Sequence, residues 1–433
     1  MLGLRSAIQR YDWGSTTHLP ELLGVEPDGG PYAELWMGAH QAAPCVVLGG
    51  TSPGEPLSDL LSRDPGRVLG ADVVARFGPR LPYLFKVLAI ARPVSLQVHP
   101  DSAQAAAGWA REEAAGLPLT SPERLFRDPE HKPEMVVALT RFEALAGFRH
   151  PERILELLDG LTGALAARLR REIERGLADG DPERALREAF AQLLRPAPAQ
   201  EVTELVGAVG RRAAAGTSSP RADATVALWA RWYPGDPGAV AGLFLNRVTL
   251  EPGESMFVPA GSPHTYLEGS ALEAMACSDN VLRAGLTAKH VDRGALLAYT
   301  RYEAGSAQLT PAEPSDATGV HQVYRAPARE FGVIVSNLTG PAVAPLPADQ
   351  GPRIALCLGG ELRLTAAGAD AQGGSAEVRM TQGDVVLVTA DDGAVSVSGQ
   401  GRLATVFVPE EAAGASSADA GAGPGAPRNT HRR

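Results

Sequence analysis

Two stretches of the chain show the short apolar runs and turns that are typical of β-strands. They cover residues 81–100 and residues 248–277, where PGE and PAGSP mark turns. Within SLQVHP, apolar residues alternate with Ser95, Gln97 and His99. Because side chains alternate across a strand, these three share one face, and the apolar ones face a core. The pattern predicts a strand with one polar face.

The segment between these stretches is rich in Ala, Leu, Glu and Arg at helical spacing. Asp, Pro or Glu opens each periodic run, as is typical of helix starts. We expect helices over residues 101–115, 151–175, 181–194 and 201–215. A helical block is therefore predicted to interrupt a β-domain.

Beyond Thr310 the chain returns to short β-like runs, among them EFGVIVSNL, RIALCLGGELRLT and RLATVFVP. Glycines and aspartates separate these runs, which predicts an antiparallel sandwich or barrel. Residues 412–433 are small and polar with nothing to bury, so we expect them to be disordered.

Composition excludes several classes of partner. The chain has 433 residues and a formal net charge of −10, with a pI near 5.5. A net acidic body of this size argues against nucleic acid or an anionic membrane as the main partner. No apolar run reaches the ~18 residues of a membrane span, and MLGLRSAIQRYDW lacks the apolar core of a signal peptide. We expect a cytoplasmic protein.

Cysteines and lysines are both scarce. Three scattered cysteines, Cys45, Cys277 and Cys357, are too few for a disulfide framework or a thiolate metal site. Of the 40 Lys plus Arg, the lysines are only Lys86, Lys132 and Lys289. A lysine retained against such a bias can be one whose role needs a compact amine that can lose its proton, which arginine cannot provide. The alternative is that these three lysines remain by chance.

A candidate metal site combines the polar strand face with a downstream turn. In LEPGESMFVPAGSPHTYLEG, the spacing of Gly253, Pro259, Gly261 and His264 resembles the second signature of the cupin barrels, whose Pro-Gly turn delivers a histidine to a metal. The first cupin signature normally has two histidines flanking one residue. Here glutamine stands in place of the first of them.

The segment HKPEMVVAL offers a carboxylate for the same site. If the insert separates Glu134 from His99 in sequence only, then Gln97, His99, Glu134 and His264 can converge. Two imidazoles, a carboxylate and an amide oxygen leave an open position, which suits catalytic Zn²⁺, although iron or manganese could also bind.

Seven motifs carry a more specific resemblance. They are YDWGS, AELWMGAHQAAP, LPYLFKVL, SLQVHPD, HKPEM, VPAGSPHTYLEG and SDNVLRAGLTAKHVD. In this order they resemble type I mannose-6-phosphate isomerases over the first two thirds of the chain. The part after Thr310 has only the shape expected of that family's second cupin domain.

The resemblance implies a zinc-dependent aldose-ketose isomerase that interconverts mannose 6-phosphate and fructose 6-phosphate and supplies GDP-mannose metabolism. It implies one zinc per chain, bound by the four ligands named above, and it singles out Arg283 as catalytic. The sequence differs from the usual family motifs at Ala288 and in QAAPC, and neither difference alters a proposed ligand.

Isomerisation also needs a base near C1 and C2. Burial beside zinc and an arginine would favour the neutral form of Lys132, and Glu273 lies on a strand after the His264 turn, so both stay open as candidates. Tyr266 is a candidate for orienting the substrate or relaying a proton, and His131 for opening the sugar ring.

The substrate phosphate requires cationic and hydroxyl donors. Ser95, Lys86 and Lys289 are the proposed phosphate-binding residues, the two lysines lying within the family motifs. In the second barrel, Gly383 and Thr389 repeat the spacing of the metal turn without its proline or histidine, so we expect that domain to bind no metal.

The predicted fold class is mainly β with a helical insert, comprising two cupin-type jelly-roll barrels and an α-helical domain. The predicted layout is a catalytic cupin domain over 1–100, 131–149 and 235–310, a helical insert over 101–130 and 150–234, a metal-free cupin domain over 311–411, and the tail over 412–433. The expected partner is a small phosphorylated sugar, with no nucleic acid and no membrane, and the expected state is a monomer.

Two other classes of function compete with this hypothesis. A cupin sugar-binding or regulatory protein would keep the ligands and lose the cationic set, whereas Lys132, Arg283 and Lys289 are all present. A metal-dependent oxygenase on the same barrel would need a redox metal and no phosphate pocket. Metal analysis and a comparison of phosphorylated with free sugar would separate it from an isomerase.

Overall fold

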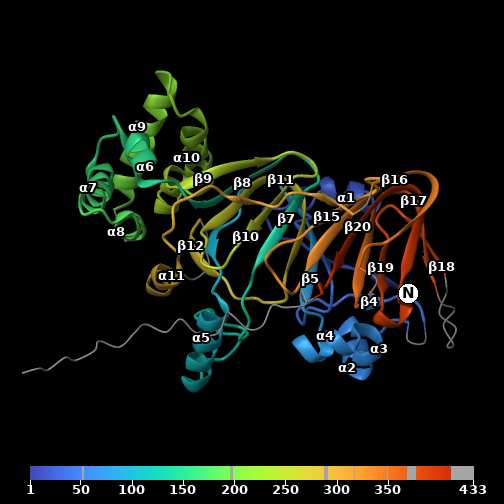
Figure 1. The fold of residues 1–433 in the computed structure, drawn as a ribbon. Helices are drawn as coiled ribbons and strands as arrows, with labels where there is room; N and C mark the ends of the chain where they lie inside the picture. The colour runs from blue at the N-terminus through green and yellow to red at the C-terminus, as the bar shows by residue number, and fades with distance from the viewer. Residues whose placement is uncertain are drawn as a thin grey trace, which may run out of the picture.

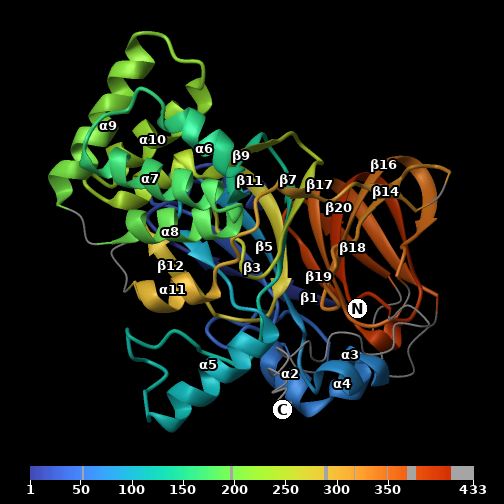
Figure 2. The same cartoon turned by 60° about the vertical axis from the view of Figure 1, so that its left-hand side comes forward.

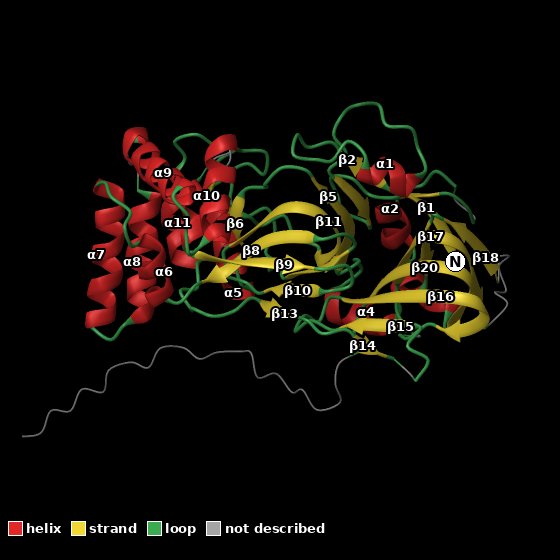
Figure 3. Ribbon diagram, turned by 90° about the horizontal axis from the view of Figure 1, so that it is seen from above, coloured by secondary structure: helices red, strands yellow, loops and turns green. Residues whose placement is uncertain are grey.

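The computed structural model describes residues 1–50, 53–195, 198–286, 291–315, 317–348, 350–367 and 377–410. The chain is mainly β, with two antiparallel sheets and a block of helices at one end (Figure 1). Seen from above, the helical block, the first sheet and the second sheet follow one another along the molecule (Figure 3). The predicted mainly β class with a helical block is confirmed, and the predicted tail lies outside the described residues.

The first sheet has 11 strands and is built around one long central strand. The central strand β11 (His264–Ala276) pairs with β5 (Tyr83–Ile90) and β7 (Glu134–Ala138) through its second half, and with β6 (Leu96–Val98) and β8 (Phe142–Phe148) at its start. The remaining strands of this sheet are β2 (Ala7–Gln9), β3 (Glu34–Met37), β9 (Leu245–Leu250), β10 (Ser255–Val258), β12 (Leu282–Gly285) and β13 (Gln308–Leu309).

The second sheet has nine strands. Most come from the last third of the chain, but β1 (Leu2–Arg5) and β4 (Val46–Val47) join them, with Leu2 opposite Leu387 of β19 (Val385–Val388). The predicted layout gave all of residues 1–100 to the first domain and did not include this pairing; its boundaries stay a prediction. The other strands are β14 (Glu313–Pro314), β15 (His321–Tyr324), β16 (Gly332–Pro345), β17 (Arg353–Ala366), β18 (Glu377–Thr381), β19 (Val385–Val388) and β20 (Val395–Phe407).

Some helices form a block, and the others are distributed over the rest of the molecule. Residues 151–175, predicted as one helix, form two, because Gly160 and Gly163 have positive φ angles of 68° and 113° and interrupt the run. The helical block comprises α6 (Pro151–Leu158), α7 (Ala164–Ala178), α8 (Pro182–Leu194), α9 (Ala199–Ala214), α10 (Pro220–Trp232) and η1 (Pro237–Leu243). Outside it lie α1 (His18–Leu23), α2 (Leu57–Arg63), α3 (Pro65–Leu69), α4 (Ala71–Phe77), α5 (Ser102–Ala114), α11 (Arg293–Tyr299) and η2 (Ala390–Asp392).

Two hydrophobic cores join these parts. One packs the helical block against β6 and β8, with Leu96 and Leu145 buried among residues of α6 to α10. The other lies between the two sheets, where Phe85 and Met135 of the first share a core with Val333 and Leu356 of the second. Turning the molecule shows the helices α2 to α4 below both sheets (Figure 2). Among the described residues, no helix has both the length and the apolar character needed to cross a bilayer.

Candidate metal centre

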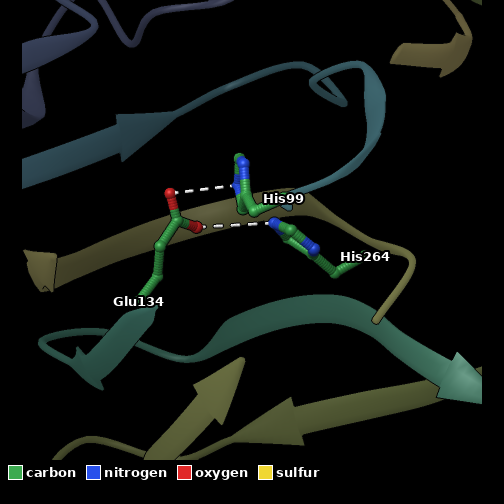
Figure 4. Close-up of side chains that lie close together, drawn as sticks. All are labelled: His99, Glu134 and His264. Carbon is green, nitrogen blue, oxygen red and sulfur yellow. Dashed lines mark ion pairs between the residues drawn. The ribbon is translucent and has the colours of Figure 1, made fainter. Parts of the chain in front are cut away.

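Three buried side chains from different elements converge in the first sheet (Figure 4). His99 follows β6, Glu134 begins β7 and His264 begins β11. The Nε2 atom of His99 lies 3.2 Å from Oε1 of Glu134, and Nε2 of His264 lies 3.4 Å from Oε2. Each of the three side chains is at most 3% exposed. One atom from each residue lies within 4.8 Å of the others, a spacing that suits a shared metal ion.

The hydrogen bonds of the two imidazoles fix which nitrogen faces the carboxylate. Nδ1 of His99 lies 2.8 Å from the carbonyl of Asn280, and Nδ1 of His264 lies 3.0 Å from the carbonyl of Ser262. A carbonyl only accepts, so each Nδ1 is the donor, and in its neutral form each ring directs the lone pair of Nε2 toward Glu134. Both Nε2 atoms are buried, and neither has a hydrogen-bond partner among the described residues. Two lone pairs facing a carboxylate fit a cation between them.

Burial determines the protonation of this group. It lowers the pKa of His99 to about 4, despite the opposing effect of the Glu134 carboxylate. Burial alone would raise the pKa of Glu134, but His99 and Lys132 outweigh it and hold that pKa well below its usual range. A neutral imidazole and an ionised carboxylate are the protonation states that bind metal.

Gln97 lies beside the group in the sheet. Its Cα pairs with that of His264 on one side and with that of Arg283 in β12 on the other. The register therefore brings the fourth predicted ligand next to one of the three converging residues and next to the predicted catalytic arginine.

Glu134 has two further polar neighbours. The ammonium of Lys132 lies 3.1 Å from Oε1, and the hydroxyl of Tyr266 donates to Oε2 at 3.5 Å. Both side chains are buried. Burial, followed by the charges of Glu134 and Glu273, raises the pKa of Tyr266 well above its usual value, so its hydroxyl keeps its proton.

Lys86 lies between two carboxylates. Its Nζ is 3.1 Å from Glu273 and 3.5 Å from Glu34, and 5.3 Å from the ring centre of Trp36. Burial alone would lower the pKa of Lys86, but the carboxylates of Glu34, Glu273 and Glu134 outweigh it and raise that pKa. This lysine is therefore a fixed cation whose charge is already neutralised.

Glu273 differs from Glu134 in its protonation. Burial raises the pKa of Glu273 to about 7, in spite of the nearby ammonium of Lys86. A carboxyl group with this pKa can both accept and donate a proton near neutral pH, which is the property required of a general acid-base group.

The remaining predicted residues are distributed differently. Arg283 is half-buried in β12, and its pKa is lowered by burial and then by Arg127. Ser95 is also half-buried, immediately before β6. Lys289 lies outside the described residues. His131 contacts Glu330, at 3.0 Å between Nε2 and Oε1, and does not join the group around Glu134.

Sequence reasoning missed two residues that support the site, Asn280 and Glu34. Asn280 is fully buried, and its side chain accepts from the backbone N–H of Arg127 and donates to the carbonyls of Asp128 and Glu130, each at 2.8 Å. Glu34 pairs with Lys86, as described above. The signal for Asn280 was its place beside Arg283 in SDNVLRAG, where a buried amide needs several backbone partners.

Comparisons with known proteins point to one enzyme family. Residues 1–151 match the model of the family described as phosphomannose isomerase type I, catalytic domain. Mannose-6-phosphate isomerase from Escherichia coli (strain K12) is 38% identical over 408 residues, which is 94% of this chain and 99% of that protein. The enzyme of the same name from Homo sapiens is 33% identical, over 78% of this chain and 82% of its own.

Solved structures give the same result. A zinc-bound crystal structure of mannose 6-phosphate isomerase aligns with a TM-score of 0.82 and 35% identity, over 94% of this chain and 99% of the other. A mutant phosphomannose isomerase from Salmonella typhimurium aligns with a TM-score of 0.83 and 36% identity, with the same coverage.

Proposed function

The chain belongs to the mannose-6-phosphate isomerase family, and from this premise we propose that it interconverts D-mannose 6-phosphate and D-fructose 6-phosphate. The observation that carries the proposal is the pair of imidazole Nε2 lone pairs directed at the Glu134 carboxylate, within a fold shared with a zinc-bound relative. The proposed cofactor is one zinc ion per chain, held by His99, Glu134, His264 and Gln97.

The reaction moves a carbonyl between C1 and C2 of the sugar. Zinc, when bound, supplies positive charge that stabilises the negative charge developing on the oxygens of these carbons. Arg283 is proposed to add a second fixed cation, since its guanidinium has no carboxylate within ion-pair distance among the described residues.

Glu273 is the proposed base. It would take the proton from C2 of mannose 6-phosphate and return it to C1, while a second proton passes from the oxygen of C2 to that of C1 through an enediol. Its pKa of about 7 suits both steps. Lys132 fits this role less well, because its ammonium is already paired with Glu134 at 3.1 Å. Tyr266 is the proposed relay between the oxygens.

The phosphate group requires cations that are not already neutralised. Ser95 and Lys289 remain the proposed phosphate-binding residues, together with Arg283. Lys86 is proposed to orient Glu273, because Glu34 and Glu273 already balance its charge. His131 is proposed to be structural, given its contact with Glu330.

The finer parts of the hypothesis are also proposals. Both sheets are proposed to be cupin barrels, the second of them without a metal. The product is proposed to enter GDP-mannose metabolism in the cytoplasm, and the chain is proposed to act as a monomer.

One experiment tests the main proposal. The purified chain is incubated with mannose 6-phosphate, and fructose 6-phosphate is measured before chelation, after chelation and after zinc is added back. We expect turnover to disappear with the metal and to return with zinc. His264→Ala should lose both zinc and turnover, Arg283→Ala should keep zinc and turn over slowly, and His150→Ala, at the exposed start of α6, should behave as wild type. A zinc-loaded chain that forms no fructose 6-phosphate would contradict the proposal.

A further inference from the structure

The motif YDWGS, residues 11–15, has no role in the metal centre or in the mechanism proposed above. The edge strand β2 ends at Gln9, whose Cα is paired with that of Glu34 in β3. The chain then turns, and Gly14 forms a bridge with Ile90 at the end of β5. The motif therefore passes from the Glu34 end of β3 to the end of the strand beside it.

Backbone contacts hold this turn in one position. The N–H of Gly14 donates to the carbonyl of Tyr11 at 3.0 Å, and the carbonyl of Trp13 accepts from the N–H of Ala91 at 3.0 Å. A Cβ added at Gly14 would lie 2.6 Å from the backbone nitrogen of Ala33, so this close approach requires glycine. The turn is therefore a fixed support for its two aromatic side chains.

The rings of Tyr11 and Trp13 are stacked, with their centres 5.7 Å apart and an angle of 28° between their planes. Trp13 packs against the hydrophobic cluster that contains Leu88 and Tyr266. Tyr266 in turn donates to the Glu134 carboxylate of the metal centre. Tyr11 is the outer ring of the stacked pair, since 38% of its surface is exposed. The stack therefore leads from the metal centre to solvent.

The charges around Tyr11 agree with the position that the register and the stacking give it. Burial raises the pKa of Tyr11, and the carboxylates of Glu34 and Asp279 raise it further. The cations Lys86 and Arg283 act in the opposite direction. The net shift is upward, so the hydroxyl keeps its proton at neutral pH. Tyr11 is therefore an uncharged hydrogen-bonding group among charged ones.

A phosphorylated sugar needs a contact of this uncharged kind. Zinc and Arg283 are proposed to act at C1 and C2, and Ser95 and Lys289 at the phosphate. The hydroxyls of C3, C4 and C5 between them carry no charge. A tyrosine suits this part of the sugar, because its ring packs against carbon-bound hydrogens and its hydroxyl both donates and accepts. Pockets for small molecules commonly combine aromatic surface with a few such polar groups.

We propose that Tyr11 is a substrate-binding residue that contacts the neutral middle of the sugar phosphate, C3 to C5, through its ring and its hydroxyl. The inference rests on the proposed isomerase function, because it adds a contact to the same substrate. Such a contact makes Tyr11 a determinant of specificity for a six-carbon sugar phosphate over the phosphate ion alone.

The test compares Tyr11→Phe, which loses the hydroxyl, with Tyr11→Ala, which also loses the ring. Ile8→Ala is the matched control, because Ile8 is 37% exposed on the same edge of the sheet but pairs with Leu35, on the opposite face from Glu34. In the zinc-loaded chain, calorimetry measures the affinity for glucitol 6-phosphate, an open-chain analogue of the substrate, and for inorganic phosphate. The kcat and KM for mannose 6-phosphate are measured with the same variants.

We expect Tyr11→Phe to weaken binding of glucitol 6-phosphate about 3- to 10-fold, the effect of one uncharged hydrogen bond. Tyr11→Ala should weaken it about ten-fold or more, because the covering ring is lost as well. The affinity for inorganic phosphate should not change, since this ion does not reach Tyr11. KM should rise with the loss of affinity while kcat stays within about three-fold, because the contact is made before and during the reaction alike. Ile8→Ala should behave as wild type.

Two results would overturn the inference. One is an unchanged affinity of Tyr11→Ala for glucitol 6-phosphate. The other is an equal loss of affinity for glucitol 6-phosphate and for inorganic phosphate in the Tyr11 variants, since that would mean a general disturbance of the site. A wild-type chain that binds glucitol 6-phosphate but forms no fructose 6-phosphate contradicts the proposed function alone, because the calorimetry still tests Tyr11.

Discussion

The buried ammonium of Lys86 shows how contacts restrict what a side chain can do. Its sequence context indicated a phosphate ligand, but its contacts with Glu34 and Glu273 already balance its charge. A lysine with two carboxylate partners is a weaker candidate for a phosphate than an arginine such as Arg283, which has none among the described residues. The contact does, however, fix the orientation of Glu273, whose protonation then becomes important.

Glu273→Gln should reveal the proposed base through the dependence of turnover on pH. Burial raises the pKa of Glu273 to about 7, so the basic form appears as pH rises through that value, and turnover of the wild type should rise with it. The same pKa shift has the opposite effect on stability. The contribution of Glu273 to the free energy of unfolding is fully present below its unfolded pKa of about 4.3 and is lost as pH rises through 7. Glu273→Gln should lower turnover by about 100-fold or more.

The control for this variant is Glu268→Gln, an exposed position on the same strand. It should leave the pH profile of kcat and the dependence of urea unfolding on pH unchanged. If Glu273→Gln retained the wild-type rise of kcat near pH 7, another group would be the base.

Asn280→Ala should weaken zinc binding without removing a ligand. The carbonyl of Asn280 accepts from His99, and its amide holds the segment from Arg127 to Glu130 that precedes Glu134. Without the hydrogen bonds of the Asn280 side chain, His99 and Glu134 should be held less firmly. The zinc affinity should then fall about 10- to 100-fold. Competition of the zinc-loaded protein with a chelator measures this directly. Asn337→Ala, an exposed asparagine of β16, should not change it.

The strand β11 shows how a single element brings distant residues together. Its first half carries His264 and Tyr266, and its second half carries Glu273. A straight strand would separate Tyr266 from Glu273 by about 24 Å. Instead the charges of both Glu134 and Glu273 act on Tyr266, because the pairing shifts between Tyr266 and Glu268 and the strand bends.

Gly269 lies at this bend, and Gly269→Ala should destabilise the fold. Its φ is 110°, and an added Cβ would lie 2.4 Å from the carbonyl oxygen of Arg141. Strain and overpacking together should lower the free energy of unfolding by about 2 to 4 kcal/mol, measured in urea. Gly210→Ala, at an open position in α9, should have no cost or stabilise slightly. A harmless Gly269→Ala would mean that the bend does not depend on glycine.

The strands around the site could be predicted because their signals are local. The alternation in SLQVHP and the turn PAGSP precede His99 and His264 directly, and Asp101 forms the capping box that begins α5. The break between α6 and α7 was not predicted, because the composition is helical throughout this segment. Two glycines there adopt positive φ angles and interrupt the helix. The pairing of β1 with β19 was missed because no local pattern records a partner that lies so far along the chain.

The two sheets form one structural unit through their common core. Phe85 and Met135 pack in the same cluster as Val333 and Leu356, so neither sheet can expose that face without loss of buried apolar area. His131 adds a polar contact at this boundary through Glu330, which precedes β16. Burial alone would raise the pKa of Glu330, but the hydrogen bond from His131 outweighs it and lowers that pKa.

His131→Gln should therefore affect stability more than turnover. We expect the free energy of unfolding to fall by about 1 to 2 kcal/mol at neutral pH, with kcat within about three-fold of wild type. Because the pKa of Glu330 is lowered, its contribution to the free energy of unfolding is present above its unfolded pKa and is lost as pH falls through the folded pKa. The difference in stability between wild type and variant should therefore shrink in acid. A large fall in kcat at unchanged stability would instead support ring opening by His131.

The pairing of Leu2 to Leu4 with residues 385–387 also constrains how the chain is made. A ribosome that adds about 5 to 20 residues per second releases the partner strand roughly 20 to 80 s after the first one. During that interval β1 can pair with β4 but not with β19, so one edge of it stays unpaired and available to chaperones. The second sheet can close only after the chain has been made as far as Phe407.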